Sequence, residues 1–168
     1  MSRSLLLLLP ALVIPVQASD VPGAVEVQPG VWILKGTPNE GTCQALKRNR
    51  FTQVIDLRRD EEPSLDCESE SSRLQEIGVQ YMRYAIGKVP PAADFDFLRT
   101  LLKDLPKGSK VLIHCSNGNR AAAVVCPWLV LDRGMALEDA FRIAREAGLR
   151  LPETEAAVRR YLSTKGQA

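Results

Sequence analysis

The sequence predicts an α/β fold in which a mostly parallel central sheet is flanked by helices on both faces. Short apolar, β-branched runs alternate along the chain with helical patterns of about ten residues, which is typical of strands joined by helical crossovers. The most apolar run, residues 110–114, leads directly into a glycine-containing loop and then a helix. Ligands of such folds bind beyond the carboxyl ends of the strands, so we expect the functional site at this loop.

The first half of the chain supplies most of the predicted strands. Residues 25–27 and 31–34 read as two strands joined by a tight turn at Pro29-Gly30. Asn39 or Thr42 can cap a helix that runs to Asn49. The run 51–58 has a short β-branched centre and predicts a buried strand. An acidic, proline-containing loop is expected at 59–71, followed by a helix over 72–77 and an alternating strand over 79–84.

The second half predicts four helices around one buried strand. After a proline-rich loop at 87–93, Asp94 is a suitable N-cap for a helix over 95–105. The strand 110–114 precedes the loop 115–119 and a helix over 120–132, which we expect Pro127 to kink. Two further helices are expected over 137–147 and 152–161.

Composition and the N-terminus indicate an exported single domain. The 168 residues are 45% hydrophobic, enough for one domain with a real core, assigned to 19–168. A net charge of +2 and 5% aromatic residues argue against nucleic-acid binding. Residues 1–18 have the basic start, short apolar stretch and small terminal residues of a cleavable signal peptide. We therefore expect a secreted or periplasmic protein with no stable membrane anchor after cleavage.

The four cysteines leave the disulfide pattern open. If Cys115 remains a thiolate, Cys43 with Cys67 is the simple pair that also spares Cys126. The alternative is that Cys43 and Cys67 are ordinary small residues. His114 is the only histidine, so no histidine-based metal cluster is expected, and no motif for a cofactor is present.

The segment from Cys115 to Arg120 has the features of an anion-binding loop beside a reactive thiolate. A thiol reacts as the thiolate, which the amides and dipole of a helix N-terminus stabilise. Gly118 permits the positive φ that a curled ring of amides needs, and Asn117 and Asn119 tolerate such backbone. Arg120 offers a planar two-pronged donor for a tetrahedral oxyanion. A merely buried cysteine requires none of these neighbours.

These residues resemble the protein tyrosine phosphatase superfamily, and in particular its bacterial beta-lactamase-hydrolase-like phosphatases. The resemblance is carried by Val54-Ile55-Asp56-Leu57-Arg58 with the following acidic loop, and by His114-Cys115-Ser116-Asn117-Gly118-Asn119-Arg120-Ala121. It covers about residues 29–151, and the loop from His114 to Arg120 is its specific part.

The resemblance implies a phosphatase-like hydrolase acting on phosphate esters, either small molecules or proteins. Cys115 would attack phosphorus to form a phosphocysteine, while Arg120 and the loop residues Ser116, Asn117, Gly118 and Asn119 would bind the phosphate oxygens. An aspartate from a mobile loop would protonate the leaving oxygen and later activate water. Asp94 lies at about the family's position for this acid, and Asp96 is the second candidate.

Two departures from the family pattern keep other functions open. Four residues separate Cys115 from Arg120, where these phosphatases usually have five, and Ala121 stands where a serine or threonine usually follows the arginine. The shorter loop resembles that of the rhodaneses, which would use Cys115 to carry a persulfide from a sulfane-sulfur donor. A non-catalytic anion-binding module is a third hypothesis.

The residues around the loop have expected supporting roles. The resemblance implies that His114 is buried under the loop and orients backbone, and it cannot pair with Cys115 because adjacent strand residues point to opposite faces. Asp56 and Arg58 end the neighbouring strand, where they either brace the loop or pair with each other.

Overall fold

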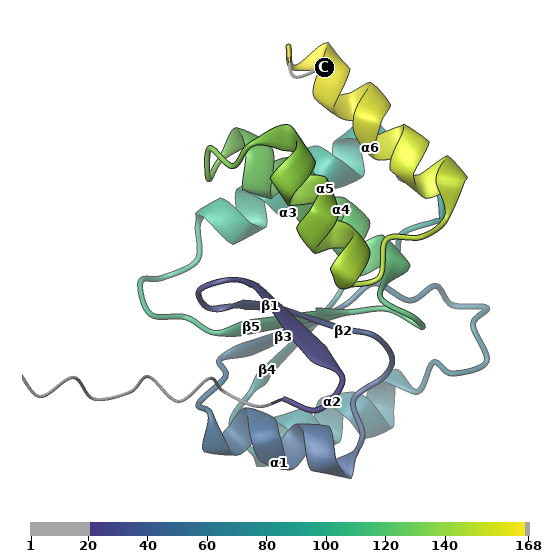
Figure 1. The fold of residues 1–168 in the computed structure, drawn as a ribbon. Helices are drawn as coiled ribbons and strands as arrows, with labels where there is room; N and C mark the ends of the chain where they lie inside the picture. The colour runs from purple at the N-terminus through teal and green to yellow at the C-terminus, as the bar shows by residue number, and fades with distance from the viewer. Residues whose placement is uncertain (1–20, 167–168) are drawn as a thin grey trace, which may run out of the picture.

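A computed structural model describes residues 21–166, and its centre is a five-stranded sheet in the order β1-β2-β5-β3-β4 (Figure 1). The strands are β1 (Ala24–Gln28), β2 (Val31–Leu34), β3 (Gln53–Asp56), β4 (Gln80–Arg83) and β5 (Val111–His114). β1 pairs with β2 in the antiparallel sense, whereas the pairs β2–β5, β5–β3 and β3–β4 are parallel. The predicted fold class is therefore confirmed.

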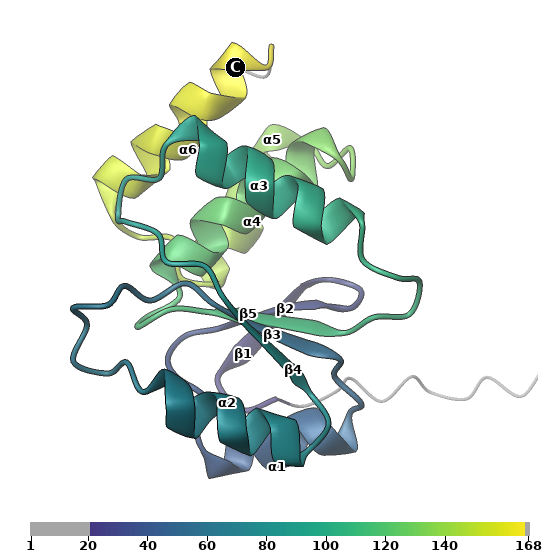
Figure 2. The ribbon, with the colours of Figure 1, turned by 180° about the vertical axis from the view of Figure 1, so that it is seen from behind.

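Helices cover both faces of this sheet, as Figures 1 and 2 show. One face carries α1 (Glu40–Arg48) and α2 (Cys67–Glu76). The opposite face carries α3 (Ala92–Lys103), α4 (Asn119–Leu131), α5 (Leu137–Glu146) and α6 (Pro152–Thr164). α4 packs against α3, α5 and α6 and is buried almost throughout, so the helix that follows the Cys115 loop is the centre of this layer.

The period-2 alternation of the strands divides the core into two clusters. On β5, Val111 and Ile113 contribute to the cluster beneath α3–α6, whereas Leu112 contributes to the cluster beneath α1 and α2. Cys115 lies in the first cluster. The side chain of His114 points to the other face, among groups from β3 and α2 (described below). The expectation that His114 and Cys115 face opposite ways is confirmed.

Two helix starts differ from the prediction. α2 begins at Cys67 rather than at residue 72, because Asp66 accepts a hydrogen bond from the Ser69 amide at 3.0 Å and caps the helix. The prediction that Asp94 caps α3 is wrong: the helix begins at Ala92, and Asp94 lies in its first turn. Asn39, one of the two candidates, does cap α1.

Other sequence predictions have mixed outcomes. α4 continues through Pro127 without interruption. All four cysteines are free thiols, so Cys43 and Cys67 are not joined here.

Among the described residues, no helix has both the length and the apolar character needed to cross a membrane. The predicted signal peptide, 1–18, lies outside the described residues, and export remains a prediction.

Candidate active site

Cys115 follows the last residue of β5 and is fully buried, with 0% of its surface exposed. Its Sγ lies 4.0 Å from Asn117 Oδ1. The strand is held between β2 and β3, so the start of the loop is fixed by two parallel neighbours. The sulfur thus lies at the carboxyl end of the central strand, where the sequence predicted the site.

The loop after Cys115 curls into the N-terminus of α4. Gly118 has φ 84° and ψ −17°, the left-handed conformation, and α4 begins at the next residue. The Asn117 side chain supports the curl by accepting a hydrogen bond from the Asn119 amide at 3.1 Å. That amide is consequently already paired, and the other loop amides and the positive end of the helix dipole are left to stabilise an anion.

Gly118 is also required by close packing. A Cβ built on Gly118 would lie 2.7 Å from the carbonyl oxygen of Ala147. On the other side of this contact, Gly148 has φ 123°, and a Cβ there would lie 3.0 Å from the Gly118 carbonyl carbon. The turn between α5 and α6 therefore packs directly against the Cys115 loop.

We expect Gly118→Ala to destabilise the protein and weaken anion binding. The left-handed conformation costs an L-residue roughly 1–2 kcal/mol, and the clash with Ala147 adds to this cost. Chemical denaturation and phosphate titration would measure both effects. Gly36→Ala is the matched control because a Cβ there meets nothing within 4 Å; equal behaviour of the two variants would contradict this role of Gly118.

Asn119 ties the loop to the start of α6 and to the β4–α3 connection. Its Oδ1 accepts hydrogen bonds from the amides of Arg150, at 2.9 Å, and Leu151, at 3.0 Å. Its Nδ2 donates to Thr154 Oγ1 at 2.9 Å, and this hydroxyl donates to the carbonyl oxygen of Lys88 at 2.6 Å. Asn119 therefore has mainly a structural role, which the sequence suggested for both loop asparagines.

Arg120 folds back over the loop and is anchored on three sides. Its Nη1 donates to the carbonyl oxygens of Leu57 and Ile86, both at 3.1 Å. The Glu62 carboxylate accepts from Nη1 at 2.5 Å and from Nη2 at 2.7 Å. Nη2 also donates to Ser116 Oγ at 3.1 Å. Arg120 is 6% exposed as a residue, and these contacts hold its guanidinium in one orientation.

The pairing of Arg120 with Glu62 shifts both groups toward their charged forms. Burial acts to raise the pKa of Glu62, but hydrogen bonds from Arg120 and the Arg59 amide hold this pKa below its usual value. Burial likewise acts to lower the pKa of Arg120, but Glu62 and the charge of Cys115 raise it. Since the carboxyl pKa is lowered, the pair is intact near neutral pH and is lost as the pH falls through that lowered value.

A pocket of about 210 Å³ opens beside this arginine. Its lining combines the loop and helix start with the acidic loop after β3 and the β4–α3 connection: Ser116, Asn117, Asn119, Arg120, Arg59, Glu61, Glu62, Lys88 and Leu151. Lys88 has no carboxylate within 4.0 Å among the described residues. The pocket therefore combines cationic and hydrogen-bonding groups, which suit an anion, with the carboxylates of Glu61 and Glu62.

The two aspartates predicted as candidate acids are not brought to this pocket. Asp94 accepts a hydrogen bond from the Tyr84 hydroxyl at 3.0 Å. Asp96 accepts one from the Tyr161 hydroxyl and lies 3.3 Å from Lys165 Nζ. The carboxylates that do line the pocket, Glu61 and Glu62, come from the acidic loop after β3, for which the sequence predicted no catalytic residue.

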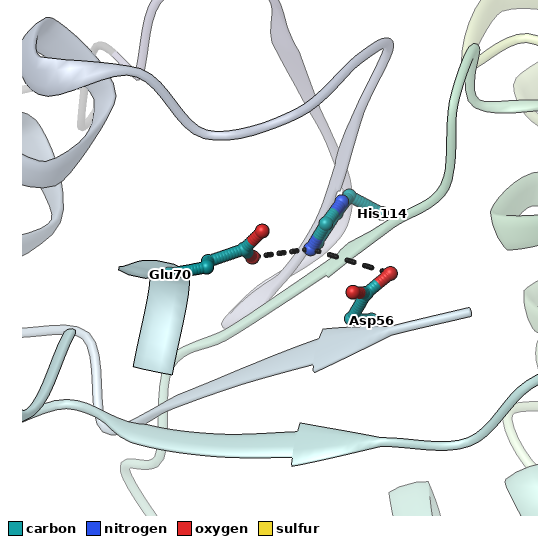
Figure 3. Close-up of side chains that lie close together, drawn as sticks. All are labelled: Asp56, Glu70 and His114. Atoms are coloured by element: carbon teal, nitrogen blue, oxygen red, sulfur yellow. Dashed lines mark ion pairs between the residues drawn. The ribbon is translucent and has the colours of Figure 1, made fainter. Parts of the chain in front are cut away.

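A second cluster lies behind the loop, on the α1/α2 face of the sheet. Figure 3 shows Asp56, Glu70 and His114, whose potential ligand atoms lie within 4.8 Å of one another, a spacing compatible with a metal ion. Arg58, however, bonds both carboxylates, donating to Asp56 Oδ2 at 2.7 Å and also to Glu70. The guanidinium thus already supplies a positive charge to both carboxylates, and Asp56 and Arg58 do pair with each other, which is one of the two roles expected for them.

Comparison with known proteins supports the fold. No protein-family model and no curated protein sequence matches the chain. A solved structure of Tk-PTP, in a mutant form, has a TM-score of 0.71 and 23% identity, covering 89% of this chain and all (100%) of that one.

Two other solved structures give the same result. A putative phosphatase (DUF442) from Shewanella putrefaciens CN-32 has a TM-score of 0.69 and 19% identity, covering 86% of this chain and 93% of that one. PTPMT1 in complex with PI(5)P has a TM-score of 0.69 and 19% identity, with 87% and 99% covered. The chain has the fold of protein tyrosine phosphatase-like proteins, as the sequence resemblance implied.

Proposed function

We propose that the chain is a cysteine-dependent phosphatase-like hydrolase that acts on phosphate esters through a phosphocysteine at Cys115. The thiolate Sγ attacks phosphorus, forming the S–P bond while the ester P–O bond breaks, and the leaving oxygen takes a proton. Water then attacks phosphorus, the S–P bond breaks, and inorganic phosphate and the thiolate are released.

The observation that carries this proposal is the anchoring of Arg120 beside Cys115. Leu57, Ile86 and Glu62 accept hydrogen bonds from the guanidinium, so its orientation over the loop is fixed in advance. Preorganised donors contribute strongly to stabilising the charge of a phosphoryl transition state because they need no rearrangement during the reaction. The buried sulfur of Cys115, the curled loop and the N-terminus of α4 lie together at the end of β5.

Catalysis requires that substrate reach a sulfur that is fully buried in this structure. Glu62 lies over the loop, where it accepts hydrogen bonds from both terminal nitrogens of Arg120. We infer that the acidic loop carrying Glu62 shifts when substrate enters and that phosphate oxygens then contact Arg120.

For the acid that protonates the leaving oxygen, the positions of the carboxylates favour a residue other than Asp94. Asp94 is engaged by Tyr84 and lies outside the pocket lining, whereas Glu61 lines the pocket. Glu62 is a poor proton donor because Arg120 keeps it ionised. We therefore assign the acid role to Glu61, whose ion-pair partner is the exposed Arg59.

We expect Glu61→Gln to lower the rate on alkyl phosphates by about 10²–10⁴-fold, the usual contribution of a general acid. Aryl phosphates, whose leaving groups need less protonation, should lose far less. Asp94→Asn should change neither rate by more than about twofold if it has no acid role. Steady-state rates on both substrate types would check this, and the reverse pattern would restore Asp94 as the acid.

The chemistry of the pocket favours anionic phosphate esters as substrates. Lys88 and Arg120 both line it, and a structural neighbour, PTPMT1, is known in complex with PI(5)P.

Ala121 provides no hydroxyl to assist departure of the sulfur. We therefore expect hydrolysis of the phosphocysteine to be slower than its formation.

Parallel assays on an aryl phosphate and on thiosulfate test the proposal against sulfur transfer. The protein lacking residues 1–18 is incubated under reducing conditions with each substrate, beside Cys115→Ser. Phosphate release that the variant lacks supports the hydrolase. Thiocyanate formation from thiosulfate and cyanide, without phosphate release, would replace it by the sulfurtransferase, and phosphate binding without either reaction would leave the anion-binding module.

A further inference from the structure

Behind the Cys115 loop, a network of five polar side chains joins three strands and α2. Asp56, Arg58, Glu70 and His114 are at most 3% exposed. Arg58 Nη2 donates to Asp56 Oδ2 at 2.7 Å and to Glu70, and Tyr81 donates to Asp56 Oδ2 at 2.8 Å. His114 Nε2 lies 2.8 Å from Glu70 Oε1, an ion pair drawn in Figure 3.

Burying this network costs desolvation free energy, and each charged side chain depends on its partners to offset that cost. Removing one partner of a buried ion pair leaves the other charge uncompensated, which destabilises strongly. Glu70 links Arg58 to His114 through separate oxygens. Its Oε1 lies 2.8 Å from His114 Nε2, and neither atom forms a hydrogen bond with any other atom among the described residues.

The backbone of the β3 end connects this network to the active site. Strand alternation places the Asp56 and Arg58 side chains on the α1/α2 face, whereas Leu57 belongs to the core on the Cys115 face. The Leu57 amide donates to the carbonyl oxygen of His114 at 2.9 Å. The Leu57 carbonyl oxygen in turn accepts from Arg120 Nη1 at 3.1 Å.

The same strand end also places the second backbone acceptor of Arg120. The Ile86 amide donates to the Leu57 carbonyl oxygen at 3.3 Å, and the Ile86 carbonyl oxygen accepts from Arg120 Nη1 at 3.1 Å. The Tyr84 amide donates to the Asp56 carbonyl oxygen at 2.8 Å. Both carbonyls that orient the arginine are therefore held by the segment whose side chains the buried network fixes.

We propose that the network of Asp56, Arg58, Glu70, Tyr81 and His114 is a positioning device that orients Arg120 for anion binding from the opposite face of the sheet. This inference rests on the proposed function, since Arg120 is taken as the anion-binding group. None of the five side chains touches the substrate. Their effect is transmitted through the Leu57 and Ile86 carbonyls.

Vanadate binding, measured by calorimetric titration, tests this inference without requiring turnover. Glu70→Gln keeps the shape of the side chain but removes its charge, and we expect its dissociation constant for vanadate to rise about threefold to thirtyfold. Tyr81→Phe, which removes only the hydroxyl on Asp56, should fold even if Glu70→Gln does not, with a smaller rise. Both should raise KM for an aryl phosphate.

Leu74→Ala is the matched control, since Leu74 is buried in the same helix, α2, with 0% exposure and no part in the network. It should lower the melting temperature yet bind vanadate as the wild type does. Wild-type affinity in both network variants would overturn the inference alone, whereas no binding by the wild type would overturn the proposed function with it. Stoichiometric Zn²⁺ bound by the wild type and lost in Glu70→Gln would replace the network by a metal site.

Discussion

Arg120→Lys is expected to lower kcat/KM for an aryl phosphate by about a thousandfold, near the loss seen on removing one transition-state donor or an essential arginine. Lysine keeps the charge but has no planar fork. It cannot stay anchored on the Leu57 and Ile86 carbonyls and also offer two parallel donors, which the guanidinium presents to Glu62 here and to phosphate oxygens once Glu62 moves away. Both kcat and the affinity for phosphate should fall.

Arg142→Lys provides the comparison for this variant. Arg142 lies on α5 with a side chain that is 59% exposed, and its ion pairs are with neighbouring residues of the same helix. Its replacement should leave the kinetics unchanged. If Arg120→Lys retained wild-type kcat/KM, the guanidinium would have no special part in the chemistry, and the assignment of the anion site would be wrong.

Cys115→Ser is expected to remove turnover almost completely, by at least about 10⁴-fold, because a serine hydroxyl without a base is a far weaker nucleophile. Anion binding should survive, since Arg120 and the loop amides are unchanged. Rates and phosphate affinity would be measured on the same preparation. Cys67→Ser, at a partly exposed cysteine outside the pocket lining, should remain active; inactivity of both variants would point to general damage rather than a lost nucleophile.

The strands and most helices could be predicted from local patterns of apolar residues, whereas the polar first turns of α2 could not. The runs at β2 and β5 are continuous and apolar, which identified them as buried strands. The start of α2 was missed because its first turns are acidic and polar, and the burial of Glu70 depends on Arg58, twelve residues earlier. No hydrophobic period signals such an ionic contact.

The candidate site was predictable where its residues are contiguous. The loop from Cys115 to Arg120 has a recognisable spacing, and Gly118 has the positive φ that was expected. Glu62 was not singled out, because its role depends on how the acidic loop folds back onto Arg120. Lys88 and Thr154 were not recognised either, since they meet the loop only through tertiary contacts.

Trapping the covalent intermediate shows whether Cys115 is the nucleophile. The protein is mixed with an aryl phosphate, quenched in acid within the first turnovers, digested and examined by mass spectrometry. We expect the peptide containing Cys115 to gain the mass of one phosphoryl group, and we expect no such gain in Cys115→Ser. Phosphate release with this peptide unmodified, or a persulfide on Cys115 after thiosulfate without any phosphoryl adduct, would contradict a phosphocysteine mechanism.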